Sequence, residues 1–334
     1  MKKSKLIVFD MDGVLIDVSG SYRETVRQTA KLFFNIAPSS EKLPEPLFPL
    51  ADLAAVKQSG GLNNDWDLSC LIINLLFNQI EKPPVYRSKD PWVQYQETIS
   101  QCDVGALGDF LGSTPKPLSV MLQRAGKTKN ALIYGLYTGD VGSGNIIKQI
   151  FQEVYLGKDL FKATYDQTPR FYRGDGLIRR EALLTNKGFL EELAAEHVLA
   201  IATGRPRAEA DYPLDRFGIR KYFTRIMALE DCLEQEKRIL ITEGQKVSLS
   251  KPHPYMLDAL AAETQLPVAE YVYIGDMPDD MLAAKRSATG YKGIGMLLST
   301  PDKALLKADL LKAGADSIIE DFDQLGRLLE SDKI

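Results

Sequence analysis

The second half of the chain alternates between short apolar segments and longer segments with helical periodicity. The apolar segments predict strands at 198–202, 223–227, 271–274, 292–296 and 316–319. The segments between them predict helices at 181–196, 207–217, 254–263, 278–287, 301–312 and 321–330. Strands joined through helices lie parallel in one sheet, and the helices cover both of its faces. The pattern therefore predicts an α/β fold with a doubly wound parallel sheet.

The apolar segment at 5–10 has the character of a strand of this sheet, yet the pattern resumes only after residue 175. The chain between them contains few strand-like runs. Helical patterns lie there near 19–35, 66–80, 92–102, 117–124 and 143–156. We therefore expect a core domain formed by 1–18 and 175–334, interrupted by an inserted, mainly α-helical domain at 19–174. A length of 334 residues accommodates two such domains.

Composition argues against several classes of protein. The formal net charge of −4 does not suit a surface for nucleic acid or anionic membranes, and no apolar run approaches the roughly 20 residues of a membrane span. Too few apolar residues precede Asp10 for a signal peptide. The cysteines, Cys70, Cys102 and Cys232, are too widely spaced for a disulfide framework or a zinc site. These features favour a cytoplasmic protein whose partner is neither nucleic acid nor membrane, and they leave the oligomeric state open.

Two carboxylates, Asp10 and Asp12, end the first apolar segment on one face of the expected strand. Burying two like charges is costly, which points to a bound metal or a reaction, although a structural turn remains an alternative for this pair alone. The two histidines, His197 and His253, lie in no spacing typical of a catalytic triad or a metal site. Catalysis would therefore use carboxylates, lysine and hydroxyls.

Two later segments carry further candidates. Thr203, Gly204 and Arg205 directly follow the segment 198–202, where a glycine lets the backbone turn and present N–H groups to an anion. The same residues can also form a plain turn that caps the next helix. Lys251 is held extended by the proline that follows it, although most lysines of this kind are solvated surface residues.

The segment 271–274 ends in Gly275 and Asp276, and Asp279 and Asp280 open the next expected helix. Helix capping accounts for Asp279 or Asp280, which lie in the first helical turn, but it does not account for Asp276. The carboxyl ends of parallel strands lie at one edge of a sheet, which is where α/β folds bind ligands. We therefore expect these candidates to meet there.

In their order, four segments resemble the motifs of the haloacid dehalogenase superfamily of phosphotransferases: Asp10-Met11-Asp12, Thr203, Lys251 and Gly275-Asp276-Met277-Pro278-Asp279-Asp280. The resemblance implies a Rossmann-like core with the helical, C1-type cap of the first subfamily inserted between the first two motifs. The segments 202–207 and 275–281 are similar to those of the phosphoglycolate-phosphatase-type branch.

The resemblance implies a role for each acidic residue. Mg²⁺ would be bound by Asp10, Asp276 and the backbone carbonyl of Asp12. Asp280, and less directly Asp279, would support the metal shell. Asp10 would be the nucleophile that forms an aspartyl-phosphate. Asp12 would protonate the leaving alcohol and then deprotonate the attacking water.

The resemblance also implies how the phosphoryl group is held. Thr203 and the nearby backbone at Gly204 and Arg205 would bind its oxygens, and Lys251 would neutralise charge on the nucleophile and the transferring group. The charged stretch 230–245 is longer than is usual before this lysine, which leaves Lys246 as a substitute.

The inserted domain would read the leaving group of the substrate. Its candidate contacts are Asn63, Asn64 and Trp66, which follow a pair of glycines, and Arg23 in the first expected helix of the insertion. The alternative is a glycine turn followed by a helix cap, with Trp66 packed inside and Arg23 on the surface.

The function expected from these residues is a Mg²⁺-dependent phosphatase, a phosphoric monoester hydrolase that acts on a small phosphorylated metabolite. A phosphomutase of the β-phosphoglucomutase type is an alternative, because a phosphoaspartate can pass its phosphoryl group to a second hydroxyl. A binding module that keeps the fold without catalysis is a third possibility. Dehalogenation fits less well, because displacement of halide does not need the proton-transfer group that Asp12 supplies.

Overall fold

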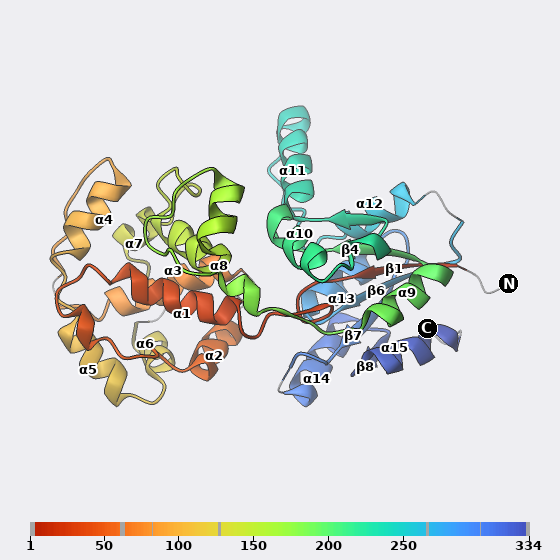
Figure 1. Ribbon diagram of the computed structural model, residues 1–334, viewed down its shortest axis with the longest axis horizontal. Coiled ribbons are helices and arrows are strands. Elements are labelled where there is room, and N and C mark those ends of the chain that lie inside the picture. Colours follow the sequence, from red (N-terminus) through yellow and green to blue (C-terminus); the bar gives the residue numbers. More distant parts are fainter. Residues whose placement is uncertain are drawn as a thin grey trace. The chain divides into compact units, whose positions relative to one another are not determined.

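The computed structural model describes residues 4–60, 64–81, 83–125, 128–264, 267–300 and 302–331. The chain divides into two compact units, Met1–Val18 with Glu181–Ile334, and Ser19–Arg180 (Figure 1). The second boundary therefore lies between residues 180 and 181, whereas the sequence pattern predicts it at 175. The first unit contains the parallel sheet. In the second unit, every regular element among the described residues is helical.

Six parallel strands form the sheet of the first unit, in the order β5-β4-β1-β6-β7-β8. The strands are β1 (Lys5–Phe9), β4 (Val198–Ala202), β5 (Arg225–Met227), β6 (Glu270–Gly275), β7 (Lys292–Met296) and β8 (Ser317–Ile319). The apolar segments of the sequence predict all six, so the doubly wound parallel sheet is confirmed.

Helices cover both faces of this sheet, as the buried apolar clusters show. One face packs against α9 (Lys187–Glu196), α10 (Arg207–Arg216) and α15 (Phe322–Glu330). The other packs against α11 (Leu229–Glu243), α12 (Tyr255–Glu263) and α13 (Pro278–Arg286). A smaller cluster joins α13 to α14 (Lys303–Ala313).

Strand β1 lies at the centre of the sheet, and all of its residues are buried. It pairs with β4 on one side and β6 on the other, and the register sets Phe9 beside both Ile201 and Ile274. The residues that follow these three strands are thereby brought to one edge. A point where the strand order changes direction is the usual ligand site of an open α/β sheet.

The chain leaves and re-enters the first unit through a two-stranded antiparallel sheet of β2 (Ile16–Asp17) and β3 (Ala182–Leu183). The prediction of a helix over 181–196 is therefore wrong at its start, because residues 182–183 pair with β2. Helix α9 begins only at Lys187, where the side chain of Asn186 accepts a hydrogen bond from the backbone of Phe189, 2.7 Å away.

The second unit is a set of α-helices with two short 3₁₀ turns, η1 (Ser40–Lys42) and η2 (Leu177–Arg180). The α-helices are α1 (Tyr22–Phe33), α2 (Leu50–Gly60), α3 (Asp65–Phe77), α4 (Pro91–Ile99), α5 (Gly105–Ser113), α6 (Pro117–Ala125), α7 (Ala131–Gly135) and α8 (Ile146–Tyr165). Most residues of α3 are buried, so this helix supplies much of the core of the unit. The sequence predicts α1, α3, α4, α6 and α8, and it misses the other three.

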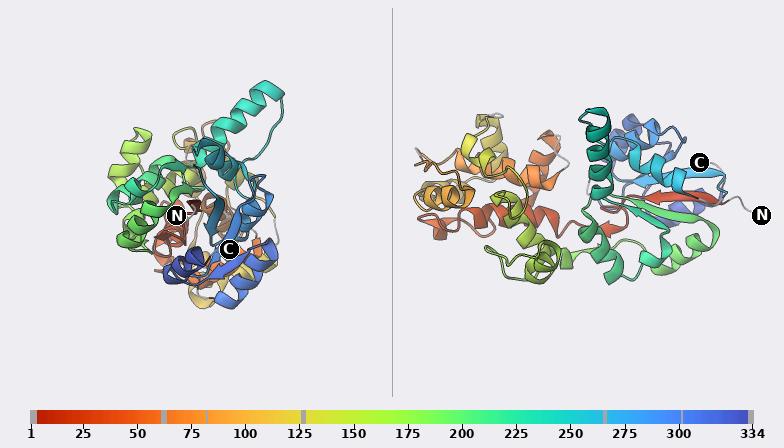
Figure 2. Two further views of the ribbon diagram at one scale, coloured as in Figure 1. Left: turned by 90° about the vertical axis from the view of Figure 1, so that its right-hand side faces the viewer. Right: turned by 90° about the horizontal axis from the view of Figure 1, so that it is seen from above.

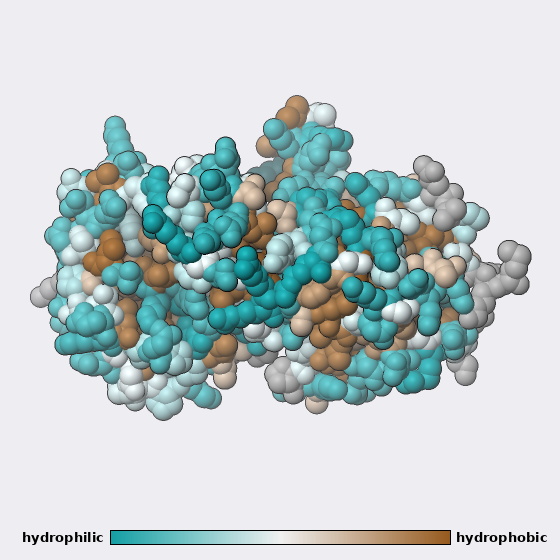
Figure 3. Space-filling view, in the orientation of Figure 1, coloured by the Kyte–Doolittle hydropathy of each residue, from teal (hydrophilic) through white to brown (hydrophobic). Residues whose placement is uncertain are grey.

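Helix α11, which the sequence also misses, joins the core of the first unit through Cys232 and Ile239 but projects from the rest of that unit (Figures 1 and 2). Only Cys232 is buried among its residues, while Leu233, Leu240 and Ile241 are exposed. The hydropathy colouring shows apolar side chains near its end (Figure 3). Among the described residues, no helix combines the length and the apolar character that a membrane crossing needs.

Candidate active site

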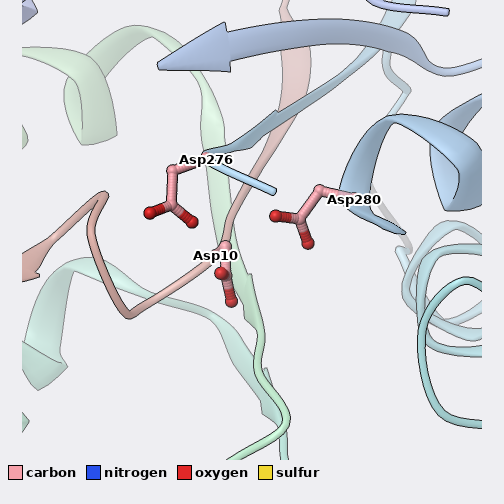
Figure 4. A group of neighbouring side chains, drawn as sticks. All are labelled: Asp10, Asp276 and Asp280. Carbon is pink, nitrogen blue, oxygen red and sulfur yellow. The ribbon is translucent and has the colours of Figure 1, made fainter. Parts of the chain in front are cut away.

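Three carboxylates meet at the carboxyl edge of the sheet (Figure 4). Asp10 directly follows β1, Asp276 directly follows β6, and Asp280 lies in the first turn of α13. One oxygen of each lies within 4.8 Å of the corresponding oxygens of the other two. The acidic residues that the sequence places at two different strand ends are thus brought together, and this acid cluster offers the hard oxygen ligands that a divalent cation prefers.

Burial and mutual repulsion act on the acid cluster. Burial is the main cause that raises the pKa of Asp10 to about 7; Lys251 opposes the rise, and Asp280 and Asp12 add to it. Burial also raises the pKa of Asp276 well above its ordinary value, with Asp10 as the next cause. A cation bound among these oxygens would relieve both effects.

Two neighbouring residues fix Asp276 in place. Gly13 has a φ of +72°, and a Cβ at that position would lie 1.9 Å from Oδ2 of Asp276. Only glycine therefore fits this close approach. Ser299, in the loop after β7, donates a hydrogen bond to the same oxygen, 3.2 Å away. Ser299 was not predicted from the sequence, although its place just beyond a strand of the same sheet is a signal that could have identified it.

Lys251 lies against the acid cluster. Its ammonium group donates to Oδ1 of Asp10 at 2.7 Å, to Oδ1 of Asp280 at 2.7 Å and to the hydroxyl of Tyr273 at 3.0 Å. Burial would lower the pKa of Lys251, but Asp10 and Asp280 hold it well above its ordinary value. The alternative, Lys246, is exposed. The long stretch before Lys251 forms α11 and so does not displace this lysine.

Tyr273 is a second residue that the sequence analysis missed. It is fully buried on β6, and its hydroxyl donates to Oδ1 of Asp280 at 2.8 Å while it accepts from Lys251. The ammonium group of Lys251 has three N–H bonds, and these three contacts engage all of them. Tyr273 therefore completes the support that holds Lys251 against Asp10.

The turn after β4 has features of both a capping turn and an anion-binding turn. Thr203 is buried, and its Oγ1 accepts a hydrogen bond from the backbone N–H of Arg205, 3.2 Å away, as in a plain capping turn. Gly204 is open, because a Cβ placed there would meet nothing within 4 Å. The side chain of Arg205 is buried, and its Nε donates to Oδ1 of Asp12 at 2.6 Å.

Asp12 and Asp279 do not contribute a carboxylate to the acid cluster. The side chain of Asp12 is 34% exposed and contacts Arg205 instead. Asp279 is half-buried in the first turn of α13. The expected metal contact of Asp12 was through its backbone carbonyl, and that expectation stays a prediction.

Among the candidates of the second unit, Asn64 fits the alternative of a helix cap, and the half-buried Trp66 and Arg23 decide between neither interpretation. The side chain of Asn64 caps α3 by accepting from the backbone of Trp66 at 2.8 Å. Trp66 is half-buried, and the ammonium group of Lys148 lies 4.1 Å from the centre of its ring. Arg23 is half-buried on α1. Asn63 lies outside the described residues, so its predicted role stays untested.

Part of the first unit is similar to known proteins. Residues 185–294 match the family model described as haloacid dehalogenase-like hydrolase. Phosphoglycolate phosphatase of Pasteurella multocida is 26% identical over 164 residues, which are 48% of this chain and 63% of that protein. Its counterpart in Haemophilus influenzae is 26% identical over 163 residues, which are 48% of this chain and 62% of that protein.

A longer alignment, of 290 residues at 23% identity, relates 86% of this chain to 42% of the imidazoleglycerol-phosphate dehydratase of Phytophthora nicotianae. The chain thus spans at most 63% of the length of these curated relatives.

Two solved structures share the fold. A structural-genomics crystal structure has a TM-score of 0.68 at 19% identity and covers 99% of this chain and 100% of its own. A phosphatase from Thermococcus thioreducens has a TM-score of 0.52 at 20% identity and covers 92% of this chain and 99% of its own.

Proposed function

We propose that this chain, whose residues 185–294 match the haloacid dehalogenase-like hydrolase model, is a Mg²⁺-dependent phosphatase of a small phosphorylated metabolite. One observation carries the proposal: the oxygens of Asp10, Asp276 and Asp280 gather within 4.8 Å, with Lys251 bonded to Asp10. A structural turn would not need three carboxylates in one place, because their burial and repulsion are unfavourable.

The acid cluster fits Mg²⁺. Its ligands are hard oxygen donors, and the raised pKa values of Asp10 and Asp276 reflect burial and negative charge that a cation would offset. When bound, Mg²⁺ would reduce the charge of the phosphoryl oxygens that otherwise repels a nucleophile.

Asp10 would be the nucleophile. One of its carboxylate oxygens forms a bond to phosphorus, while the bond from phosphorus to the leaving alcohol oxygen breaks. Lys251 holds Oδ1 of Asp10 and so restricts the rotation of the carboxylate before the reaction. The product of this first step is an aspartyl-phosphate on Asp10 and a free alcohol.

Asp12 would move the protons of both steps. Its carboxyl group gives a proton to the leaving oxygen in the first step. In the second step its carboxylate takes a proton from water, whose oxygen forms a bond to phosphorus as the bond to Asp10 breaks. Inorganic phosphate leaves, and both aspartates return to their starting forms.

The turn after β4 would bind the phosphoryl oxygens. Gly204 is exposed, with open space beside its Cα, so its backbone N–H would be the one to meet an anion there. Thr203 is buried directly after the strand, next to Gly204 in sequence.

The substrate class is tested by a panel of phosphate esters with and without Mg²⁺. The panel contains phosphoglycolate and imidazoleglycerol phosphate, which the names of the relatives suggest, together with sugar phosphates and p-nitrophenyl phosphate. We expect Mg²⁺-dependent release of inorganic phosphate that is abolished in Asp10→Asn. The matched control is Asp323→Asn, because Asp323 belongs to another Asp-x-Asp segment and is exposed.

Three results would contradict the proposal. Turnover without a divalent cation would show that the reaction needs no metal. An active Asp10→Asn variant would show that Asp10 is not the nucleophile. Conversion of a sugar phosphate to its isomer, without release of phosphate, would identify a phosphomutase instead.

A further inference from the structure

Arg205 lies beside the candidate active site, and its guanidinium group is directed into the protein and not toward solvent. Its side chain is only 1% exposed. Nε donates to Oδ1 of Asp12 at 2.6 Å, and Nη1 donates to Oε2 of Glu181 at 3.0 Å. The side chain of Glu181 is fully buried. Two carboxylates on either side of the inserted unit in sequence therefore share one guanidinium group.

Further contacts fix Arg205 from other directions. Nη1 also donates to the backbone carbonyl of Glu209, 3.0 Å away. The backbone N–H of Arg205 donates to Thr203 at 3.2 Å, and its carbonyl accepts from the N–H of Leu229 at 2.9 Å. A guanidinium group is planar and rigid, so these bonds determine where Nε points. It points at Asp12.

The side chain of Asp12 is less buried than that of Arg205, so packing restrains it less. Its side chain is 34% exposed, and an exposed aspartate samples several rotamers. The bond from Arg205 holds Oδ1 and leaves the second carboxylate oxygen for proton exchange. Proton transfer requires such a group to lie within hydrogen-bond reach of the reacting oxygen.

We propose that Arg205, anchored by Glu181, is a positioning residue for Asp12 rather than a ligand of the substrate phosphate. The inference rests on the proposed function and adds to it a residue that acts through Asp12. The sequence predicts a phosphoryl contact only for the backbone of Arg205, and this inference concerns its side chain.

The path of the chain brings Glu181 close to Asp12, so that it can anchor Arg205. Glu181 directly precedes β3, and Asp12 comes shortly before β2, which pairs with β3. Arg205 therefore links the two crossings of the chain at a point beside their paired strands. Arg216 donates from Nη1 to the backbone carbonyl of Glu181 at 3.2 Å, which holds this anchor from another side.

The test separates the two chemical steps with p-nitrophenyl phosphate. Its leaving group departs without help from an acid, so misplacing Asp12 leaves formation of the aspartyl-phosphate fast. Hydrolysis of the intermediate still needs Asp12 to accept a proton from water. Stopped-flow measurement should therefore show a burst of p-nitrophenolate close to one equivalent of enzyme, with kcat about 10- to 100-fold below wild type.

The variants are chosen so that folding does not decide the result. Arg205→Gln alone removes a cation from the buried Glu181 and can unfold the protein. The paired variant Arg205→Gln with Glu181→Gln removes both charges and is the main test, with thermal unfolding measured alongside. Arg205→Lys should restore less than the full rate, because an amine cannot reproduce the fork of bonds.

Two further variants calibrate the burst. Asp12→Asn shows the effect of losing the base altogether. Arg207→Gln is the matched control, because Arg207 lies two residues away and bonds Asp231 and the carbonyl of Ile226 instead. It should keep the wild-type rate and show no new burst.

Each outcome decides the inference. A burst in the paired variant, as in Asp12→Asn, supports it. A folded paired variant with unchanged kcat, or with a lower kcat and no burst, overturns it while the phosphatase activity of the wild type stands. A wild type that hydrolyses no phosphate ester overturns the proposed function, and the inference falls with it.

Discussion

Replacement of Gly13 by alanine should disrupt the acid cluster without altering any carboxylate. Gly13 has a φ of +72°, in the left-handed region that L side chains rarely adopt. An added Cβ would lie 1.9 Å from Oδ2 of Asp276 and 2.7 Å from Oγ of Ser299. Atoms cannot approach so closely, so Asp276 must move.

The size of the effect follows from that distance. The oxygen of Asp276 must retreat from 1.9 Å to at least 3.0 Å, a shift of about 1.1 Å. Metal–ligand distances tolerate about 0.2 Å. A misplacement of about 1 Å lowers catalytic rates by about 100-fold. We therefore expect Gly13→Ala to lower kcat/KM and Mg²⁺ affinity by about 100-fold each, and the backbone strain to cost about 1–2 kcal/mol of stability.

The assay combines calorimetric titration of Mg²⁺, steady-state kinetics and thermal unfolding. The matched control is Gly290→Ala, because Gly290 has a φ of +80° but nothing lies within 4 Å of its would-be Cβ. That variant should show the strain alone, as a small loss of stability with wild-type Mg²⁺ affinity. Wild-type Mg²⁺ affinity in a folded Gly13→Ala protein would refute the reasoning, as would an equal loss in both variants.

Three further predictions concern buried groups. Tyr273→Phe removes the hydroxyl between Lys251 and Asp280, which should lower the free energy of unfolding by about 1.5–3 kcal/mol; a loss below about 0.5 kcal/mol in urea denaturation would contradict this. Burial raises the pKa of Asp10 from 3.8 to about 7, so the metal-free folded protein keeps a proton that the unfolded chain releases. The free energy of unfolding of the metal-free protein should therefore fall as pH rises from about 4 to 7, by about 4 kcal/mol at most. Mg²⁺ should raise Tm more at pH 8 than at pH 5. A Tm that responds neither to pH nor to Mg²⁺ would contradict the raised pKa of Asp10. Burial raises the thiol pKa of Cys70, Cys102 and Cys232 to about 12, 11 and 12, respectively. A thiol reagent at pH 8 should therefore label only unfolded protein, and rapid labelling of the native state would contradict this.

The fold of the first unit could be predicted because its strands carry a local signal. A strand buried on both faces, such as β1 or β4, appears in the sequence as an almost continuous run of apolar residues. Parallel topology then places the ends of those runs at one edge. This is why Asp10 and Asp276, far apart in sequence, could be expected to meet, and why their separation in the structure is small.

The partners of each side chain could not be predicted in the same way. Arg205 follows a glycine at a strand end, which in sequence looks like a phosphate contact, yet its guanidinium group turns inward to Asp12 and Glu181. Tyr273 looks like one more apolar residue of β6, yet its hydroxyl supports Lys251. Both facts depend on rotamers and on residues distant in sequence, which no local pattern records.

Helix α11 was also missed, because charged residues dominate its stretch of the sequence. Its ends and surface are held by local contacts: the side chain of Asp231 accepts from the backbone of Ala228, Glu234 pairs with Arg238 one turn later, and Gly244 ends the helix with a positive φ. Capping and ion pairs of this kind do not produce the periodicity from which a helix is usually predicted.

The residue that carries the phosphoryl group during turnover identifies the nucleophile. The enzyme is mixed with a substrate found in the panel, quenched in acid within the first turnovers, digested and analysed by mass spectrometry. We expect one added phosphoryl group on the peptide that contains Asp10, and none in Asp10→Asn. A phosphoryl group on another residue, or an active enzyme with no phosphorylated peptide under conditions that preserve acyl phosphates, would contradict it.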